Sequence, residues 1–201
     1  MSIANYSDLQ TAVANWLHRS DLTSIIPDLI MLGEKRIFRD VRSHEMETSL
    51  NTTISGGVLA VPTGFIGWKA VYINTDRVQA LQTKSLPWIY ENYPTRSSDR
   101  CPLFIARNGS NFEFGPYPDS GYTVKGTYYK RLDPVSSSWN ALATQHPDLY
   151  LFATLCEASE YVMNQGLVPE WERKYATIVN DINTEAHKAE FSGAPLSMTG
   201  G

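Results

Sequence analysis

The sequence predicts an α+β protein in which N- and C-terminal helices form one helical bundle and an antiparallel β domain is inserted between them. Three observations predict this fold. Apolar residues recur at helical spacing near both ends of the chain, the periodicity changes from about Glu47, and the middle contains β-type segments separated by Gly-containing turns. We therefore expect residues 1–46 and 144–191 to form the bundle, residues 47–143 the inserted β domain, and residues 192–201 a flexible C-terminal tail.

The N-terminal part of the chain predicts two helices. The first is expected to begin near Tyr6, because Ser7 is a suitable N-cap and Gln10 stands three residues later, as in a capping box. The second is expected from about Pro27, since proline suits the first turn of a helix. Their apolar stripes are Leu9, Val13, Trp16 and Leu17 in the first helix, and Ile30, Gly33, Ile37 and Val41 in the second.

The middle of the chain predicts two hairpins, two further strands and one short helical turn. Gly- and Asn-containing sequences at residues 55–57 and 108–111 are expected to form the hairpin turns, because these residues adopt the backbone conformations that tight turns need. The expected segments are residues 52–54 paired with 58–61, a buried strand at 65–73, a helical turn at 86–93, 103–107 paired with 112–114, and a half-exposed strand at 122–128.

The last third of the chain predicts two long helices. Pro147 and Pro169 are expected to open them, and Gly166 suits the position just past the end of the first. Their apolar stripes are Leu149, Phe152, Leu155, Cys156, Ser159, Val162 and Met163 in the first, and Trp171, Tyr175, Ile178, Ile182 and Ala189 in the second.

Composition excludes several classes of protein. The chain has 201 residues, of which 42% are hydrophobic and 19% charged, so extensive disorder is not expected. A net charge of −4 argues against a bulk electrostatic binder of nucleic acid. We expect no membrane-spanning helix and no signal peptide, since no apolar run is long enough. Cys101 and Cys156 are far apart and form no disulfide or metal-binding pattern, so a globular protein of a reducing compartment is expected.

Sequence motifs of catalysis are absent. The chain contains no nucleophile elbow, no phosphate-binding loop and no zinc-protease helix motif, and its four histidines stand alone. Asp181 and Glu185 are four residues apart on one predicted helix face, and Glu157 and Glu160 are three apart. A glycosidase needs two carboxylates across a cleft, which neighbours on one helix do not supply. We therefore predict no catalytic residue, no cofactor and no metal.

Charge is distributed unevenly along the chain. Residues 144–201 contain three basic and eight acidic residues, whereas residues 47–143 contain nine basic and seven acidic. The second predicted helix carries a basic stripe formed by Lys35, Arg36, Arg39 and Arg42. Acidic residues interrupt this stripe and no aromatic residue accompanies it for base stacking. We interpret it as a solvated face or as an interface with acidic helices.

Several segments together resemble the bacteriophage head-to-tail adaptor family, which includes tail tubular protein A and the head-completion adaptors of short-tailed phages. The similarity covers about residues 6–190. It is carried by the order and spacing of these motifs: Ser7-Asp8-Leu9-Gln10 with Trp16-Leu17, Ile26-Pro27 with Leu32-Gly33-Glu34 and Arg39-Asp40-Val41-Arg42, Val61-Pro62-Thr63-Gly64-Phe65, Phe114-Gly115-Pro116-Tyr117, Tyr128-Tyr129-Lys130-Arg131-Leu132, His146-Pro147-Asp148-Leu149, and Trp171-Glu172 with Tyr175.

The resemblance implies a structural, non-enzymatic virion protein at the head–tail interface, present in the host cytoplasm during assembly. Adaptors of this family form a ring, expected to be a dodecamer, that joins the portal protein to a tail nozzle or tail tube protein. DNA passes through the channel without sequence-specific binding, and no membrane is involved. We expect Lys35, Arg39 and Arg42 to contact the neighbouring subunit, and the tail residues Phe191, Pro195, Leu196 and Met198 to contact the portal.

Two other functions remain open from the sequence. One is a cytosolic ligand-binding module or enzyme with an unrecognised site, which a pocket with convergent polar groups would favour. The other is a tail-associated DNA-binding protein, which a steep salt dependence of duplex binding would favour.

Overall fold

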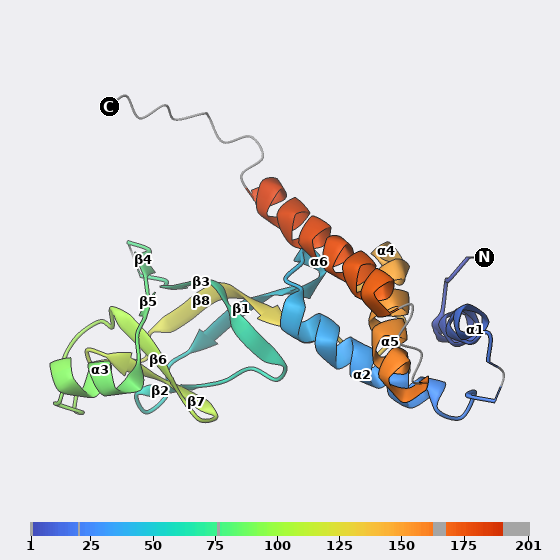
Figure 1. The fold of residues 1–201 in the computed structure, drawn as a ribbon. Coiled ribbons are helices and arrows are strands. Elements are labelled where there is room, and N and C mark those ends of the chain that lie inside the picture. The colour runs from blue at the N-terminus through green and yellow to red at the C-terminus, as the bar shows by residue number, and fades with distance from the viewer. Residues whose placement is uncertain (1, 20, 76, 163–167, 191–201) are drawn as a thin grey trace, which may run out of the picture. The chain divides into compact units, whose positions relative to one another are not determined.

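The computed structural model describes residues 2–19, 21–75, 77–162 and 168–190, and the chain divides into two compact units (Figure 1). The helical unit comprises Met1–Met46 and Leu132–Gly201, and the β unit comprises Glu47–Arg131. The predicted α+β fold class is confirmed, with helices from both ends of the chain and strands between them.

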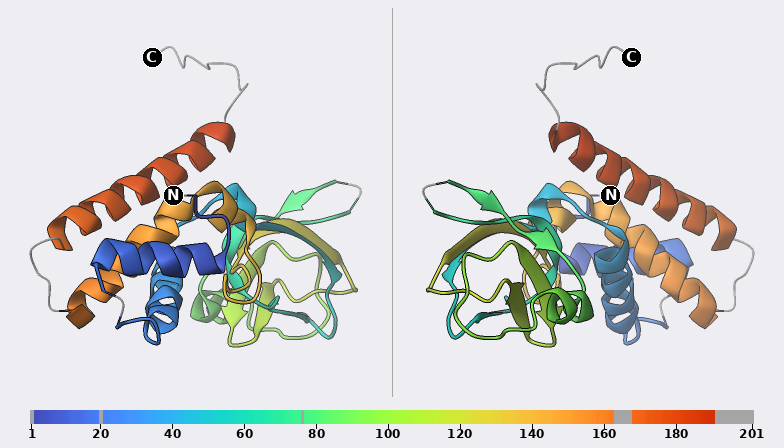
Figure 2. Two further views of the ribbon diagram at one scale, coloured as in Figure 1. Left: turned by 90° about the vertical axis from the view of Figure 1, so that its right-hand side faces the viewer. Right: turned by 90° about the vertical axis from the view of Figure 1, so that its left-hand side faces the viewer.

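In the helical unit, the long helix α5 (Pro147–Val162) packs against four other helices (Figure 2). These are α1 (Tyr6–Leu17), α2 (Ile26–Asp40), α4 (Ala141–Gln145) and α6 (Val168–Glu190), and a 3₁₀ turn, η1 (His44–Met46), follows α2. The predicted starts of α2 near Pro27 and of α6 near Pro169 agree with the structure to within one residue. Gly166 lies outside the described residues.

The start of α1 differs in detail from the prediction. The helix begins at Tyr6, but its N-cap is Asn5 rather than Ser7. The Asn5 side-chain oxygen accepts a hydrogen bond from the Asp8 amide at 3.0 Å, and the Asp8 carboxylate accepts one from the Ala4 amide at 3.1 Å. Asn5 and Asp8 therefore take the place expected of Ser7 and Gln10, two residues earlier in the chain, but Asp8 accepts from the backbone amide of Ala4 rather than from that of the N-cap residue.

Helices α2 and α5 approach closely at Gly33. A Cβ atom at this position would lie 2.9 Å from the Thr154 nitrogen and 3.0 Å from the Ala153 carbonyl carbon, both in the backbone of α5. Ile30 and Ile37, on either side of Gly33 along α2, are fully buried. The predicted apolar stripe of α2 is thus the face that packs on α5, and glycine permits the close approach.

A buried carboxyl group joins the segment after the β unit to α2. Glu34 is only 5% exposed, and its Oε1 accepts a hydrogen bond from the Val135 amide at 3.0 Å. Further along, Asn140 caps α4, and Leu142 and Ala143 are fully buried. Residues 132–143 therefore belong with the helices, although the sequence assigned them to the β domain.

We expect Glu34→Gln to stabilise the protein at neutral pH. Burial raises the pKa of Glu34, so the folded state favours the protonated form. Below about pH 4.3, the pKa of glutamate in the unfolded chain, protonated Glu34 costs the folded state no stability. As the pH rises through the pKa of Glu34 in the folded protein, this stability is lost, because the buried carboxyl group must ionise. Glutamine keeps an acceptor for Val135 without a charge. In urea titrations, the variant should match the wild type near pH 4 and exceed it at pH 7, whereas an equal difference at both values would contradict this assignment.

The β unit contains two four-stranded sheets that face a common core. The first has the order β1-β8-β3-β4 and the second β2-β7-β6-β5, and all pairs are antiparallel except β5 with β6. The strands are β1 (Glu47–Thr53), β2 (Val58–Ala60), β3 (Phe65–Ile73), β4 (Gln79–Ala80), β5 (Gln82–Thr83), β6 (Phe104–Asn108), β7 (Asn111–Gly115) and β8 (Thr123–Lys130), with helix α3 (Leu86–Asn92) after β5.

The first predicted hairpin is wrong in its strand pairing, although its turn is present. Ser55 and Val58 exchange both backbone hydrogen bonds, at 3.0 and 3.1 Å, around two glycines with positive φ. The strands on either side then separate, because β1 pairs with β8 and β2 pairs with β7. The turn carries the chain from one sheet to the other, so that Ile54 and Leu59 both enter the core. The second predicted hairpin, β6 with β7, is confirmed.

Candidate functional site

The outward face of α2 contains two kinds of basic residue. Arg36 is half-buried and lies next to α6, whereas Lys35 and Arg39 are exposed. Successive residues of a helix are rotated by about 100° around its axis. A side chain can therefore contact a neighbouring helix while the side chain of the adjacent residue faces solvent. The sequence treated these residues as one stripe, and the structure separates them.

Arg36 is the centre of an ion cluster that joins three helices. Its Nη1 donates to Oε1 of Glu172 on α6 at 2.9 Å, and its Nη2 donates to the other oxygen of the same carboxylate. The carboxylate of Glu157 on α5 lies 3.7 Å from Nη1. The guanidinium carbon is also 4.5 Å from the centroid of the Tyr175 ring. Two acidic residues of the C-terminal helices are therefore paired within the chain.

Further polar contacts join α6 to the end of α2. The Tyr175 hydroxyl donates to Asp40 at 2.8 Å. The Asn183 side chain donates to the Asp40 carbonyl at 3.0 Å and accepts from the Arg42 amide at 2.8 Å. The apolar stripe expected for α6 does not include Asn183, so the sequence did not predict this contact. The available signal was that Asn183 follows Tyr175 by two turns and so lies on the same side of the helix.

These contacts shift the pKa values of the paired groups. The hydrogen bond from Arg36 lowers the pKa of Glu172 and, reciprocally, raises the pKa of Arg36. Burial, followed by the hydrogen bond to Asp40, raises the pKa of Tyr175. Burial also raises the pKa of the Cys156 thiol to about 12, so this cysteine is protonated at neutral pH and is a poor nucleophile.

Arg42 differs from the other two residues expected at a subunit contact. Its Nη1 donates to the backbone carbonyls of Phe38 at 3.0 Å and Val41 at 2.5 Å, and its side chain is half-buried. The guanidinium thus binds carbonyl groups at the C-terminus of α2, where a positive charge is favoured by the helix dipole. Lys35 and Arg39 form no hydrogen bond or ion pair with the residues that the structure describes.

Two large apolar side chains lie exposed beside these free charges. Met31 is 45% exposed and Leu32 is 42% exposed on the same side of α2. Met31, Lys35 and Arg39 follow one another at intervals of four residues, so they form one stripe along the helix. Methionine and arginine are both enriched at protein interfaces, so the exposed Met31 in line with Arg39 is suited to a protein contact.

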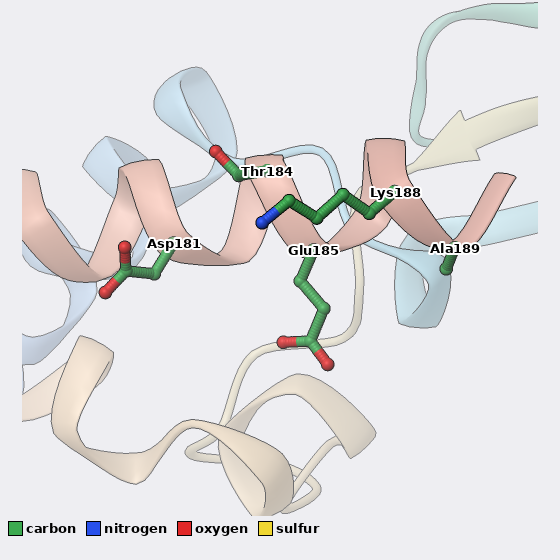
Figure 3. A pocket seen from close by; sticks show the side chains of 5 residues that line it. All are labelled: Asp181, Thr184, Glu185, Lys188 and Ala189. Carbon is green, nitrogen blue, oxygen red and sulfur yellow. The ribbon is translucent and has the colours of Figure 1, made fainter. Parts of the chain in front are cut away.

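The outer side of α6 carries opposite charges. A shallow hollow of about 540 Å³ is lined by Asp181, Thr184, Glu185, Lys188 and Ala189 (Figure 3). Figure 3 shows both carboxylates on one side of the helix and Thr184 on the other, with Lys188 extended along the helix toward Thr184. Asp181 and Glu185 form no ion pair with any described residue. This face therefore presents two carboxylates without an ion pair, with Lys188 at the border of the hollow.

A second hollow of about 150 Å³ gathers residue types that occur in hydrolases. It is lined by Ser43, His44, Glu45, His146 and Glu185, among others. The Ser43 hydroxyl is buried and has no hydrogen-bond partner among the described residues, so neither imidazole is placed to remove its proton. Nucleophilic catalysis needs that hydrogen bond, which this arrangement does not provide.

An aromatic hollow of about 350 Å³ lies in the β unit. Phe65, Trp68 and Phe112 form its walls, and Arg107 borders it. The ring centroids of these three residues lie 4.9–5.2 Å apart, so the walls are packed on one another. No acidic residue or histidine lines this hollow, so it offers apolar surface without an acid–base pair.

Within the described residues, no three His, Cys, Asp or Glu side chains come close enough together to hold a metal ion. In the same part of the chain, no helix has the length and apolar character needed to cross a membrane. The expected portal-contact residues Phe191, Pro195, Leu196 and Met198 lie outside the described residues.

Comparison with known families identifies a match over most of the chain. Residues 4–199 match the profile of the SU10 adaptor protein family. The match extends over the residues of both units and confirms the resemblance that the sequence motifs indicated. No curated protein sequence matches the chain significantly.

Proposed function

Because the chain belongs to the SU10 adaptor protein family, a family of structural bacteriophage adaptors, we propose that it forms a ring that joins the portal to the tail and extends the DNA channel. The observation that carries this proposal is the family match over nearly the whole chain. The expected assembly is a dodecamer located at the head–tail interface of the virion. The portal protein contacts one side of the ring, and a tail nozzle or tail tube protein contacts the other.

The unpaired charges of the helical unit support a ring. A closed ring is a head-to-tail arrangement in which two different surfaces of each subunit meet. The exposed cations of α2 and the exposed carboxylates of α6 are two such different surfaces. The net charge of −4 also agrees with a channel through which DNA passes without being held by its phosphates.

Mass measurement of the protein, alone and with the portal protein, tests the proposed assembly. We expect either a ring in isolation or a ring that forms on the portal, and in both cases a defined stoichiometry. A protein that stays monomeric under both conditions would overturn the proposed function. Duplex DNA added at low salt serves as a control, and tight, steeply salt-dependent binding would favour the DNA-binding alternative.

We further propose that the C-terminal segment contacts the portal through its apolar residues. Deleting residues 192–201 removes Pro195, Leu196 and Met198. Burial of one such side chain contributes about 1.5–3 kcal/mol before ordering costs. We therefore expect at least about tenfold weaker portal binding in a pull-down titration, with an unchanged thermal midpoint for the truncated protein. Equal portal affinity of the truncated and full-length proteins would rule this contact out.

A further inference from the structure

Two oppositely charged pairs on the helical unit take no part in its internal ion pairs. Lys35 and Arg39 lie on α2, and Asp181 and Glu185 lie on α6. None of the four forms an ion pair or a hydrogen bond with the described residues. By contrast, Arg36 is paired with Glu172. The four unpaired residues are therefore available to another molecule.

The two pairs have the same spacing. Each consists of residues four apart on a helix, which places the charges about 6 Å apart along one face. Two helices that present such pairs to each other form both ion pairs at once, in either a parallel or an antiparallel arrangement. The residues one turn away decide between these two arrangements.

The antiparallel arrangement matches the flanking residues. It places Arg39 opposite Asp181, Lys35 opposite Glu185, and Met31 opposite Ala189, so that an exposed apolar residue meets another exposed apolar residue. The parallel arrangement would place Met31 opposite Thr177, and would leave Ala189 opposite Ser43, which is buried and lies beyond the end of α2. Apolar contact at the end of the stripe therefore favours the antiparallel register.

The α2 and α6 of a single chain are already joined by other residues. Arg36, Asp40 and the Arg42 backbone bind Glu172, Tyr175 and Asn183. The unpaired stripes are not part of that contact, so they meet only between two copies. Charge complementarity and the head-to-tail requirement of a ring both identify the occupant as a second copy of this chain.

We infer that the α2 stripe of Met31, Lys35 and Arg39 packs antiparallel on the α6 stripe of Asp181, Glu185 and Ala189 of the next copy. This inference rests on the proposed ring. The hollow beside Asp181 and Glu185 accepts the aliphatic part of an incoming basic side chain, while its charged end meets the carboxylates (Figure 3). Lys188 borders the same hollow, and its side chain extends back along the helix toward Thr184.

Other titratable groups lie near one end of this contact. His44, Glu45 and His146 border the neighbouring hollow that also contains Glu185. Glu45 therefore adds a further carboxylate beside the surface that receives Lys35.

A charge exchange between the two stripes tests the inference. Arg39→Glu and Asp181→Arg are each expected to raise the protein concentration needed for half-maximal ring assembly by at least about tenfold, because each loses an ion pair and creates a repulsion at every interface. The double variant restores the pair with reversed polarity and should return to within about threefold of the wild type. Arg77→Glu, the same change of charge in the β unit, serves as the matched control. The effects should shrink at 1 M salt, where the Debye length is about 3 Å.

Cross-linking tests the register. With Met31→Cys and Ala189→Cys in one chain, mild oxidation should produce a ladder of covalent oligomers, whereas Met31→Cys with Thr177→Cys should not. The native Cys156 is buried, and the unmodified protein controls for Cys101. Cross-linking only by the Thr177→Cys combination would overturn the antiparallel register.

The outcomes distinguish this inference from the function on which it rests. If the wild type forms no ring with or without portal, both the proposed function and this contact fail. If the ring forms and Arg39→Glu and Asp181→Arg assemble like the wild type, the contact is wrong and the proposed function stands. If both single variants fail but the double variant does not recover, the two stripes do not meet each other and the inference is also overturned.

Discussion

Replacing Gly33 by leucine is expected to lower the free energy of unfolding by more than about 3 kcal/mol, and replacing it by alanine by about 1–2 kcal/mol. The atoms that a side chain at residue 33 would meet belong to the backbone of α5 at Ala153 and Thr154, 2.9–3.2 Å from the new Cβ. Overpacking in a filled interior costs about 1–3 kcal/mol, and backbone cannot move aside as a flexible side chain does. In the alanine variant, up to about 1 kcal/mol of this packing cost is offset, because alanine favours a helix more than glycine does.

The alanine variant distinguishes packing from helix propensity. If propensity alone mattered, Gly33→Ala would stabilise the protein by about 1 kcal/mol. Gly67→Ala is the matched control, since a Cβ at residue 67 meets no atom within 4 Å, and its effect should stay within about 0.5 kcal/mol. Urea unfolding of the three variants measures these differences. A stabilised Gly33→Ala would show that α2 and α5 are not in close backbone contact.

The helices were predictable from the sequence because each is marked by local signals. Apolar residues at helical spacing and prolines at the first turn identified α2, α5 and α6, and the stripe containing Gly33 is the one that packs on α5. The N-cap of α1 was misplaced because asparagine and serine are nearly equivalent as caps. Asn5 is held as the cap by Asp8, whose amide donates to the Asn5 side chain and whose carboxylate accepts from the Asn5 side chain and from the Ala4 amide.

The pairing of the strands was less predictable than their positions in the sequence. The segment 65–73 was identified exactly as β3, because its aromatic and β-branched residues are a local property. The partner of β1 is β8, which lies far away in the sequence, and no local signal specifies that pairing. The turn at residues 55–57 was identified correctly, but whether a turn closes a hairpin or joins two sheets depends on the core that both sheets share.

The surface that we propose as a subunit contact was predictable in its charge but not in its individual residues. The excess acid of the C-terminal helices and the basic stripe of α2 are visible in the sequence. The rotation of α2 in the bundle decides where its basic residues lie. Arg36 binds α6, Arg42 binds backbone carbonyls, and Lys35 and Arg39 lie on the surface. The predicted stripe shows which face of α2 is buried, but it does not show that α5 covers this face and that Arg36 then lies beside α6.

Replacing Arg36 by methionine is expected to lower the free energy of unfolding by about 2–3 kcal/mol. Methionine keeps much of the aliphatic volume but removes the donors to Glu172 and the charge beside Glu157. A hydrogen bond to a charged group contributes about 1.5–3 kcal/mol, and the loss of one partner leaves the other charge uncompensated. The Arg36 side chain is 23% exposed, which keeps the expected cost below that of a fully buried pair. Arg39→Met, on the same helix but unpaired, should change stability by less than about 0.5 kcal/mol.

The pH dependence of this pair gives a second, independent measurement. Because the hydrogen bond from Arg36 lowers the pKa of Glu172, its contribution to stability is present above the unfolded pKa, about 4.3, and is lost as the pH falls through the folded pKa. The wild type should therefore lose more stability than Arg36→Met between pH 5 and pH 3, so that the two unfolding curves converge under acid conditions. If the difference in unfolding free energy between the wild type and Arg36→Met stays constant over this pH range, Arg36 acts through its packing on Tyr175 rather than through its charge.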